Sequence, residues 1–583
     1  MLENRRIVII GGVAAGASAA TRARRVNEEV EIVILEKGDY VSWANCGLPY
    51  YLGGDIRRRS NLLLVSPELF WDRFRVDVRT NSEAVEIDRG GKRVRVLQSP
   101  GEADLRESEG PGAQAREAGE YWISYDKLII ATGGSPITPP LPGIDRDGVF
   151  TLTTIPDADA AYEYLGLNER KPSARRPGLE RAVVVGGGFI GIETAEALHN
   201  RGYKVTLVEL ANQVLPPFDP EMAGIISEHL KEVGIGVILG DGVAAFRGEG
   251  ERGPVRAIDL QSGKTIPADV VIQAIGVAPR IGLARAAGLE IGEAGGVVVN
   301  ARMQTSDPEI YAAGDIVESL DLVTGKRVRM PLAGPANKQG RAAGTNAAGG
   351  DLEFRGVLGT SIVKACQLTG GRTGLSEKDA AASGIDCFVS YTHNADHAGY
   401  YPGAENIAIK AVVERDTGRL LGIQAVGKRG VDKRIDVAAT AIQAGMTVED
   451  LEHLDLAYAP PFGAAKDPII IAGMTAANIK RGAVAHITPQ ELASGNNFQV
   501  LDVRTEREYR AGHIKGAVNV PLHDLRDRID DIRRLVGDGE IVVNCRVGYR
   551  SYHACRILKH HGLRPLNLSG GYRQWVATFP EEG

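Results

Sequence analysis

Two copies of one pattern constrain the fold: an apolar run ending in glycines, a helix-forming segment of small residues, and a second apolar run. The first copy covers residues 6–37, from RIVIIGG to EIVILEK, and the second covers 181–210. Such alternation around a glycine-rich turn is typical of βαβ units in a parallel, doubly wound sheet. Further strand-like runs lie at 125–136, 269–279 and 309–317. The sequence therefore predicts an α/β protein with two Rossmann-like domains.

Length and composition narrow the class of protein. A chain of 583 residues is too long for one core, and 43% hydrophobic with 24% charged residues is typical of a soluble globular protein. A net charge of −6 predicts no overall attraction to nucleic acid. No apolar stretch is long enough for a membrane span, and the first apolar run breaks at Gly11-Gly12, unlike a signal peptide.

The five cysteines are scattered and odd in number, with no C-x-x-C pair. This pattern argues against a disulfide framework and predicts no metal site. The pattern fits a reducing cytoplasm, where one or two cysteines stay as reactive thiols, better than it fits a secreted protein.

Several segments mark the organisation of the chain. Residues 98–120 are polar and rich in Gly and Pro, which predicts an inserted surface loop, and 168–180 reads as a linker. From about 335 to 455 strands and helices mix, with a hairpin around Asp416–Gly418. A smaller unit begins near 475–487.

The second copy carries the full dinucleotide fingerprint, Gly186-x-Gly188-x-x-Gly191, with Glu209 at the end of the next strand. Glycines let backbone N–H groups approach a pyrophosphate at the helix N-terminus. The carboxylate of Glu209 accepts hydrogen bonds from ribose hydroxyls and repels a 2′-phosphate, so we expect NADH rather than NADPH.

The first copy departs from this pattern, because Val13 replaces the middle glycine of Gly11-x-x-x-x-Gly16. Glu36 nevertheless lies at the expected distance, and ATGG (131–134) and AAGD (312–315) follow strands that would close over the same ligand. Two dinucleotide sites on one chain are most simply a flavin reduced by a nicotinamide.

The ordered motifs GGVAAG, SWANCGLPY, IIATGGSP, GGGFIGIE and YAAGDI resemble the pyridine-nucleotide disulfide oxidoreductase superfamily, and within it the coenzyme A disulfide and persulfide reductase group. The resemblance covers residues 5–475. It implies an FAD-binding domain at 1–155 and 290–335, an NADH-binding domain at 156–289 and an α+β dimerisation domain at 336–475.

The resemblance also implies which residues hold the cofactors. Those expected to bind FAD or NADH are Gly11, Gly12, Val13, Ala14, Ala15, Gly16, Glu36, Lys37, Thr132, Gly133, Gly186, Gly188, Phe189, Ile190, Gly191, Glu193, Glu209, Gly276, Gly314, Asp315 and Ala333.

Cys46, in SWANCGLPY, has no partner in the sequence. The fifth residue after it is Tyr51, so the C-x4-C disulfide of glutathione and lipoamide reductases is impossible. A single thiol can cycle two electrons through a mixed disulfide with a small thiol or through a sulfenic acid. Either route needs a reactive thiolate, whose pKa a helix N-terminus or an oxidised flavin would lower.

Two tyrosines bear on this choice. Tyr400 and Tyr458 match a pair that, in the coenzyme A disulfide reductases, reaches across a homodimer interface to the partner's cysteine. Tyr401 neighbours Tyr400, and the sequence barely separates them. Coenzyme A itself carries phosphates that need polar or cationic partners. By resemblance these are Ser18, Arg22, Arg25, Ser42, Asn45, Arg75, Asn337 and Lys466.

The C-terminal segment, 485–583, resembles the rhodanese family through LDVR, GHIKGAVNVP and CRVGYRS. Cys545 ends a strand and opens a loop before a helix, where backbone N–H groups favour a thiolate or persulfide. Arg546 and Arg550 add positive charge, Asp502 and Arg504 support the fold, and Cys555 packs in the core.

Together these features predict an FAD-dependent NADH:coenzyme A disulfide, persulfide or polysulfide reductase that works as a homodimer and exchanges sulfane sulfur with Cys545. One alternative is an NADH oxidase or peroxidase that uses a sulfenic acid. Another is a non-catalytic flavin-bound sulfur sensor or carrier.

Overall fold

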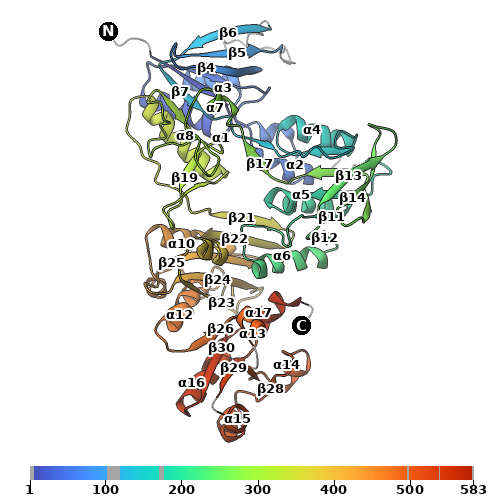
Figure 1. Cartoon of the computed structure of the whole chain (residues 1–583), viewed down its shortest axis with the longest axis vertical. Helices are drawn as coiled ribbons and strands as arrows, with labels where there is room; N and C mark the ends of the chain where they lie inside the picture. Colours follow the sequence, from blue (N-terminus) through green and yellow to red (C-terminus); the bar gives the residue numbers. More distant parts are fainter. Residues whose placement is uncertain (1–4, 101–117, 170–175, 496–497, 538, 581–583) are drawn as a thin grey trace. The chain divides into compact units, whose positions relative to one another are not determined.

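The computed structural model describes residues 5–100, 118–169, 176–495, 498–537 and 539–580 (Figure 1). They form two compact units, Met1–Leu210 with Asp241–Val357, and Ala211–Gly240 with Leu358–Gly583. Residues 101–117 of the predicted loop and 170–175 of the predicted linker lie outside the described residues.

The first sheet of the N-terminal unit is parallel, as the first sequence copy predicts. Its order is β18-β7-β1-β2-β3. The strands are β1 (Arg6–Ile10), β2 (Glu31–Leu35), β3 (Val76–Arg79), β7 (Lys127–Ile130) and β18 (Ile310–Ala312). Strand β18 comes from a distant stretch of the chain but pairs in parallel with β7. The ATGG and AAGD segments, which lie at the carboxyl ends of these two strands, therefore meet at one edge of the sheet.

The second sequence copy builds another parallel sheet in this unit, in which β11, β10, β16 and β9 follow one another. These strands are β9 (Val149–Thr151), β10 (Arg181–Val185), β11 (Lys204–Val208) and β16 (Val270–Gln273). Their buried residues are largely Val, Ile and Leu, as parallel strands covered on both faces require.

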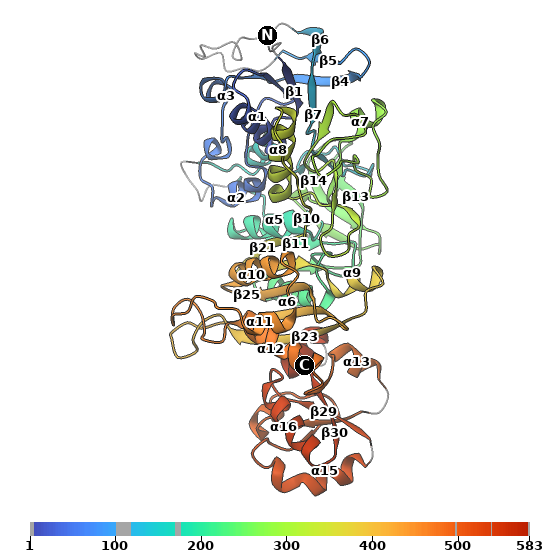
Figure 2. The same cartoon turned by 90° about the vertical axis from the view of Figure 1, so that its left-hand side faces the viewer.

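Helices and small antiparallel sheets complete the unit. The helices are α1 (Ala14–Val26), α2 (Leu48–Gly53), α3 (Pro67–Phe74), α4 (Ile155–Tyr164), α5 (Phe189–Asn200), α7 (Gly282–Ala286) and α8 (Ala333–Ala347). The antiparallel strands are β4 (Ser82–Asp88), β5 (Arg93–Gln98), β6 (Gly119–Ser124), β8 (Gly134–Pro136), β13 (Val243–Gly248), β14 (Val255–Leu260), β15 (Thr265–Pro267), β17 (Val277–Pro279), β19 (Glu318–Leu320) and β20 (Arg327–Arg329). Figure 2 shows α8 alongside α1, where small residues let the two helices approach closely.

The second unit begins with an antiparallel sheet of order β21-β22-β25-β24-β23. Its strands are β21 (Ser361–Ala365), β22 (Leu368–Gly374), β23 (Cys387–Ala395), β24 (Asn406–Glu414) and β25 (Leu420–Gly427), so the predicted hairpin around Asp416–Gly418 is confirmed. The accompanying elements are α6 (Pro220–Glu232), β12 (Gly236–Ile238), α9 (Glu377–Ala382), α10 (Val431–Gln443), α11 (Val448–Glu452) and α12 (Pro468–Lys480).

The C-terminal part of this unit is a parallel sheet of order β26-β30-β29-β27-β28. The strands are β26 (Ala485–Ile487), β27 (Gln499–Asp502), β28 (Val518–Asn519), β29 (Glu540–Asn544) and β30 (Arg564–Leu568). Its helices are α13 (Pro489–Ser494), α14 (Glu506–Arg510), α15 (Ile529–Val536), α16 (Tyr549–His560) and α17 (Gly571–Thr578). Among the described residues, no helix has the length and apolar character needed to cross a membrane.

A buried lysine joins three segments of the second unit. The Lys410 side chain on β24 is 0% exposed, and its ammonium lies 2.9 Å from Asp219, 2.5 Å from Glu221 and 2.6 Å from Glu377. Burial alone would lower the pKa of Lys410, but Tyr391 and these carboxylates raise it well above its usual value. The charged lysine therefore neutralises carboxylates that come from before α6, from α6 and from α9.

We expect Lys410→Met to lower the free energy of unfolding by about 3–5 kcal/mol, because it leaves buried carboxylates without a counter-charge. The matched control is Lys428→Met, which breaks an exposed ion pair with Glu405 and should cost at most about 1 kcal/mol. Urea unfolding followed by circular dichroism measures both. Equal stability of the two variants would show that Lys410 does not hold the cluster together.

Candidate active sites

The first glycine turn has the geometry of a dinucleotide site. The backbone N–H of Gly12 donates to the Glu36 carboxylate at 2.8 Å, which fixes the turn against the end of β2. A Cβ on Gly16 would lie 1.8 Å from the Gly11 carbonyl oxygen, so only glycine fits there. Helix α1 starts after Val13 with no side chain capping it. Its first N–H groups are therefore available to a pyrophosphate, which fits FAD.

The second glycine turn repeats these features. The N–H of Gly187 donates to the Glu209 carboxylate at 2.5 Å, and a Cβ on Gly191 would meet the Gly186 carbonyl oxygen at 1.8 Å. Gly188 caps α5 without a side-chain acceptor. The residues of this turn therefore fit a second dinucleotide, with the Glu209 carboxylate at the strand end where a ribose would lie.

The other predicted cofactor residues lie at the carboxyl ends of neighbouring strands or at helix starts. Thr132 and Gly133 follow β7, Gly314 and Asp315 follow β18, and Gly276 follows β16. Ala333 opens α8, and Ala14 and Ala15 open α1. Phe189 and Ile190 open α5, whereas Lys37 forms a surface ion pair with Glu83.

The stretch that carries Cys46 is held against the first glycine turn. The N–H of Ser42 donates to the Gly12 carbonyl at 2.9 Å. Cys46 then lies in a short 3-10 turn of three residues, Asn45–Gly47, directly before α2. From α2 the phenol of Tyr50 donates to Glu193 of α5 at 2.8 Å. One thiol, both glycine turns and a carboxylate therefore belong to one compact unit.

The protein groups around Cys46 disfavour its thiolate. Partial burial raises the pKa of the Cys46 thiol, and the carboxylates of Glu193 and Asp315 raise it further. The sequence suggested that a helix N-terminus would lower this pKa. That expectation is wrong for the protein groups alone, because burial and the two nearby acids together raise the pKa of Cys46 more than the backbone of the short turn lowers it.

Some candidate coenzyme A residues come together on α1 and α8. The Ser18 hydroxyl donates to Asn337 at 2.6 Å, and Arg22 donates to Thr345 at 2.9 Å. Arg25 lies over the ring of Phe74 and Arg75 over that of Trp71. Ser42 and Asn45 both precede Cys46 in the same stretch, and Lys466 is exposed in the second unit.

The two tyrosines are brought together in the second unit. Their hydroxyl oxygens lie 2.8 Å apart, although Tyr400 is 76% and Tyr458 48% exposed. Tyr401 instead packs edge-on against His397. The geometry therefore pairs Tyr400, and not Tyr401, with Tyr458.

The loop that follows β29 directs hydrogen-bond donors at Cys545. Its sulfur accepts from the Gly548 N–H at 3.2 Å and from the Ser551 hydroxyl at 3.3 Å, and the residue is 1% exposed. These donors stabilise a thiolate or a persulfide anion. Cys555 is buried on α16, and burial followed by the charge of Cys545 raises its pKa well above the usual value. The prediction that Cys555 is a packing residue is confirmed.

The charges around this loop are arranged differently from the sequence expectation for Arg550. Its guanidinium makes two hydrogen bonds to Glu508, at 2.8 and 2.6 Å, and Arg550 holds the pKa of Glu508 down at about 2. Much of its charge is therefore neutralised inside the protein. Asp502 and Arg504 form a buried ion pair of 2.6 Å, and Asp502 also accepts from Asn544, so their supporting role is confirmed.

Sequence reasoning missed Tyr50 and Glu508 at these sites. Tyr50 lies inside the SWANCGLPY motif, where a phenol next to a reactive thiol was a usable signal. Glu508 lies 42 residues before Arg550, and no local pattern joins them.

We expect Glu193→Gln to lower the pKa of Cys46, because it removes a nearby negative charge yet keeps an acceptor for Tyr50. More thiolate at neutral pH should speed alkylation of Cys46 by iodoacetamide by about two- to fivefold, even though a less basic thiolate is a weaker nucleophile. Peptide mass spectrometry across a pH series measures this rate. Glu290→Gln, an exposed acid outside this cluster, should leave it unchanged. If the alkylation rate depends on pH in the same way in Glu193→Gln as in the unaltered protein, the Glu193 carboxylate does not influence the ionisation of Cys46.

Comparison with known families agrees with this geometry. The pyridine nucleotide-disulphide oxidoreductase model matches residues 5–340, and its dimerisation domain matches 360–467. The rhodanese-like domain model matches 488–578. The α/β fold class, with two Rossmann-type domains, a dimerisation domain and a C-terminal rhodanese domain, is confirmed.

Three similar proteins cover most of the chain. The crystal structure of reduced Bacillus anthracis CoADR-RHD is 42% identical over 99% of both chains, with a TM-score of 0.91. A NAD-dependent persulfide reductase from A. fulgidus is 40% identical, over 98% of this chain and all of that one, with a TM-score of 0.86. The NAD(P)H sulfur oxidoreductase (CoA-dependent) of Pyrococcus abyssi is 39% identical over 80% of this chain and 96% of its own.

The likenesses extend over the glycine turns, the single-cysteine stretch and the rhodanese unit together. The chain belongs to the pyridine nucleotide-disulphide oxidoreductase family.

Proposed function

We propose that this protein is an FAD-dependent NADH:coenzyme A disulfide, persulfide or polysulfide reductase in which the rhodanese domain exchanges sulfane sulfur. The observation that carries the proposal is the position of Cys46. Cys46 is a lone thiol in a stretch that the hydrogen bond from the Ser42 N–H to the Gly12 carbonyl holds against the first glycine turn. The same chain carries a second cysteine, Cys545, whose sulfur accepts a hydrogen bond from the backbone of its loop.

The two glycine turns divide the cofactors between them. The turn at Gly11–Gly16, with Glu36, Thr132, Gly133 and Asp315 at the same sheet edge, would hold FAD. The turn at Gly186–Gly191 would hold the nicotinamide dinucleotide, with NADH favoured because Glu209 opposes a 2′-phosphate. When bound, this pair supplies the two electrons that reduce a disulfide.

Cys46 would act as the nucleophile. Its thiolate attacks one sulfur of a disulfide, so that a mixed disulfide forms and a thiolate leaves. None of the five cysteines is disulfide-bonded in the structure, and no second cysteine occurs within the Cys46 stretch. A small thiol such as coenzyme A therefore takes the place of a resolving cysteine, and Ser18, Arg22 and Asn337 supply polar contacts along α1 and α8.

The tyrosine pair supports action as a homodimer. Tyr400 and Tyr458 share a hydrogen bond on an exposed surface of the dimerisation domain, where a hydroxyl is free to turn toward a ligand. In a dimer of this chain the pair would donate to the thiolate that leaves the partner's cysteine. We place the enzyme in the cytoplasm, where five unbridged cysteines stay reduced.

The alternatives fit fewer of these features. An oxidase or peroxidase that uses a sulfenic acid has no use for the rhodanese loop. A non-catalytic sulfur carrier has no use for a second dinucleotide turn. Both are tested by the variants below.

Cys46→Ser should keep the yellow flavin but lose reduction of coenzyme A disulfide and persulfide by about a thousandfold or more, because the nucleophile is gone. NADH oxidation measured anaerobically with each acceptor checks this. Cys387→Ser removes a thiol elsewhere and should change little. Unchanged turnover would remove Cys46 from the mechanism, and fast oxygen consumption dependent on Cys46 would favour the oxidase.

Cys545→Ser should spare reduction of coenzyme A disulfide, within about twofold, yet slow the use of elemental sulfur or thiosulfate-like donors by roughly tenfold or more, because those donors need the second sulfur site. The same NADH assay measures both, so the disulfide reaction is the internal control. Equal rates with every donor would make the rhodanese domain incidental.

A further inference from the structure

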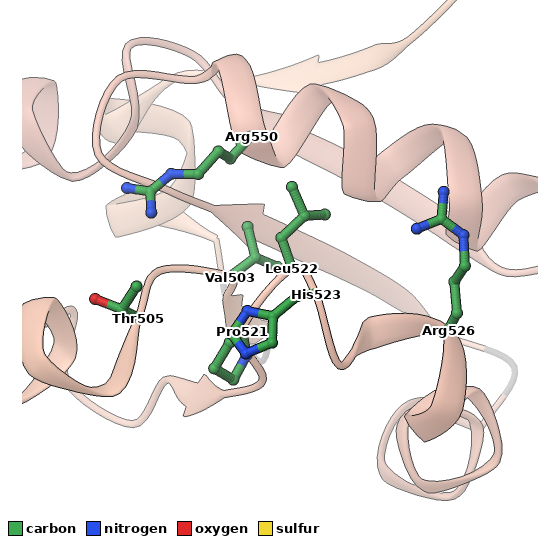
Figure 3. A pocket seen from close by; sticks show the side chains of 7 residues that line it. All are labelled: Val503, Thr505, Pro521, Leu522, His523, Arg526 and Arg550. Carbon is green, nitrogen blue, oxygen red and sulfur yellow. The ribbon is translucent and has the colours of Figure 1, made fainter.

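A cavity of about 340 Å³ lies at the carboxyl edge of the rhodanese sheet (Figure 3). Val503 follows β27, the segment from Pro521 to Arg526 follows β28, and Arg550 lies in the first turn of α16 after β29. Strands β29, β27 and β28 are neighbours, so the cavity shares its edge with the Cys545 loop. The N–H of Val503 donates at 2.9 Å to the carbonyl of Asn544, the residue before Cys545. Parallel sheets bind their ligands at this edge.

The lining of the cavity combines an apolar wall, two arginines and the polar side chains of Thr505 and His523. Val503, Pro521 and Leu522 form an apolar wall, and Figure 3 shows Leu522 between the guanidinium groups of Arg550 and Arg526. A compact inorganic anion such as thiosulfate has no part that matches this wall. A volume of 340 Å³ also falls in the range, about 300–1,000 Å³, of pockets that hold small organic ligands.

The charge of Arg526 is available to a ligand. Arg550 is paired with Glu508, and both Arg528 and Arg534 are paired with Asp531. In the described part of the chain, Arg526 makes no hydrogen bond or ion pair, and it lines the cavity. A free guanidinium beside an apolar wall suits a ligand that carries a carboxylate or phosphate beyond an apolar arm.

We propose that this cavity binds an organic persulfide that bears an anionic group. Its organic arm lies on the apolar wall of Val503, Pro521 and Leu522, and its anion contacts Arg526. The inference rests on the proposed function of Cys545 as a carrier of sulfane sulfur, and it names the class of donor. Arg526 is then a specificity-determining residue that inorganic donors do not need.

The transfer step balances without an added oxidant. The Cys545 thiolate attacks the outer sulfur of R–S–SH, a new S–S bond forms on Cys545, and the original S–S bond breaks. R–S⁻ leaves with the electron pair of that bond, and the transferred sulfur keeps its proton until the persulfide ionises. The Gly548 N–H and the Ser551 hydroxyl contact the Cys545 sulfur and so stabilise the attacking thiolate before the charge passes to R–S⁻.

The test compares Arg526→Gln with Arg528→Gln in the full-length protein. Both variants remove one positive charge from the same turn, but Arg528 is paired and does not line the cavity. Donors are coenzyme A persulfide, glutathione persulfide and thiosulfate, each below saturation. The readout is the rate at which the Cys545 peptide gains one sulfur in mass.

Arg526→Gln should slow loading from an organic persulfide by about five- to tenfold, as expected for one lost charge-assisted contact with an exposed arginine. Thiosulfate loading should stay within about twofold, and Arg528→Gln should match the unaltered protein with every donor. A loss with coenzyme A persulfide alone identifies phosphate as the anion, and a loss with glutathione persulfide identifies carboxylate.

Three results would overturn the proposal: no effect of Arg526→Gln on either organic donor, an equal effect on thiosulfate, or an equal effect of Arg528→Gln. Because loading of Cys545 needs no NADH, it remains measurable even if the reductase assays with Cys46 fail. Failure of the donor site and failure of the proposed reductase are therefore distinguishable.

Discussion

The hydrogen bond from a glycine-turn N–H to the acid at the end of the next strand organises the N-terminal unit. Gly12 donates to Glu36, and Gly187 donates to Glu209 in the same way. Each bond ties the start of a helix to the end of a neighbouring strand, so the helix N-terminus and the carboxylate face one ligand from two sides. The Cys46 stretch depends on the first bond, because Ser42 donates to the carbonyl of the same Gly12.

The two cysteines that we propose to react, Cys46 and Cys545, lie in different electrostatic surroundings. Burial, followed by the carboxylates of Glu193 and Asp315, raises the pKa of Cys46, whereas the Cys545 sulfur receives two hydrogen-bond donors. A thiol with a raised pKa forms less thiolate, so it becomes a better nucleophile when a group that favours the anion binds beside it. The Gly548 N–H and the Ser551 hydroxyl, by contrast, are placed to stabilise negative charge on the Cys545 sulfur. This difference matches a redox role for the first cysteine and a carrier role for the second.

The sequence predicted most of the fold because the features that determine it are local. Strand, glycine turn, helix and strand-end acid follow one another within 6–37 and 181–210, and the loop after β29 is set by Cys545 and the residues just after it. The Tyr50–Glu193 bond joins positions 143 apart, and Arg550 pairs with Glu508 across 42 residues. Neither pairing has a period or motif, so tertiary packing alone determines them. The same holds for the cavity beside Arg526, which three chain segments line.

Packing within the second unit also couples the sulfur loop to the neighbouring sheet. Strand β23 is an edge strand, and the Tyr391 N–H there donates to the Ser569 hydroxyl at 3.0 Å, so the edge is not left open for pairing with another chain. Three residues after Ser569, the N–H of Tyr572 donates to the Cys545 carbonyl at 2.7 Å. Through its phenol, Tyr391 also donates to Glu221, which contacts the buried Lys410. The short segment from Ser569 to Tyr572 thus contacts both the edge strand and the sulfur loop. A buried ion cluster resists rearrangement, because separating its charges would leave one of them unpaired. It therefore gives the loop a rigid base that keeps the Gly548 N–H and the Ser551 hydroxyl directed at the Cys545 sulfur.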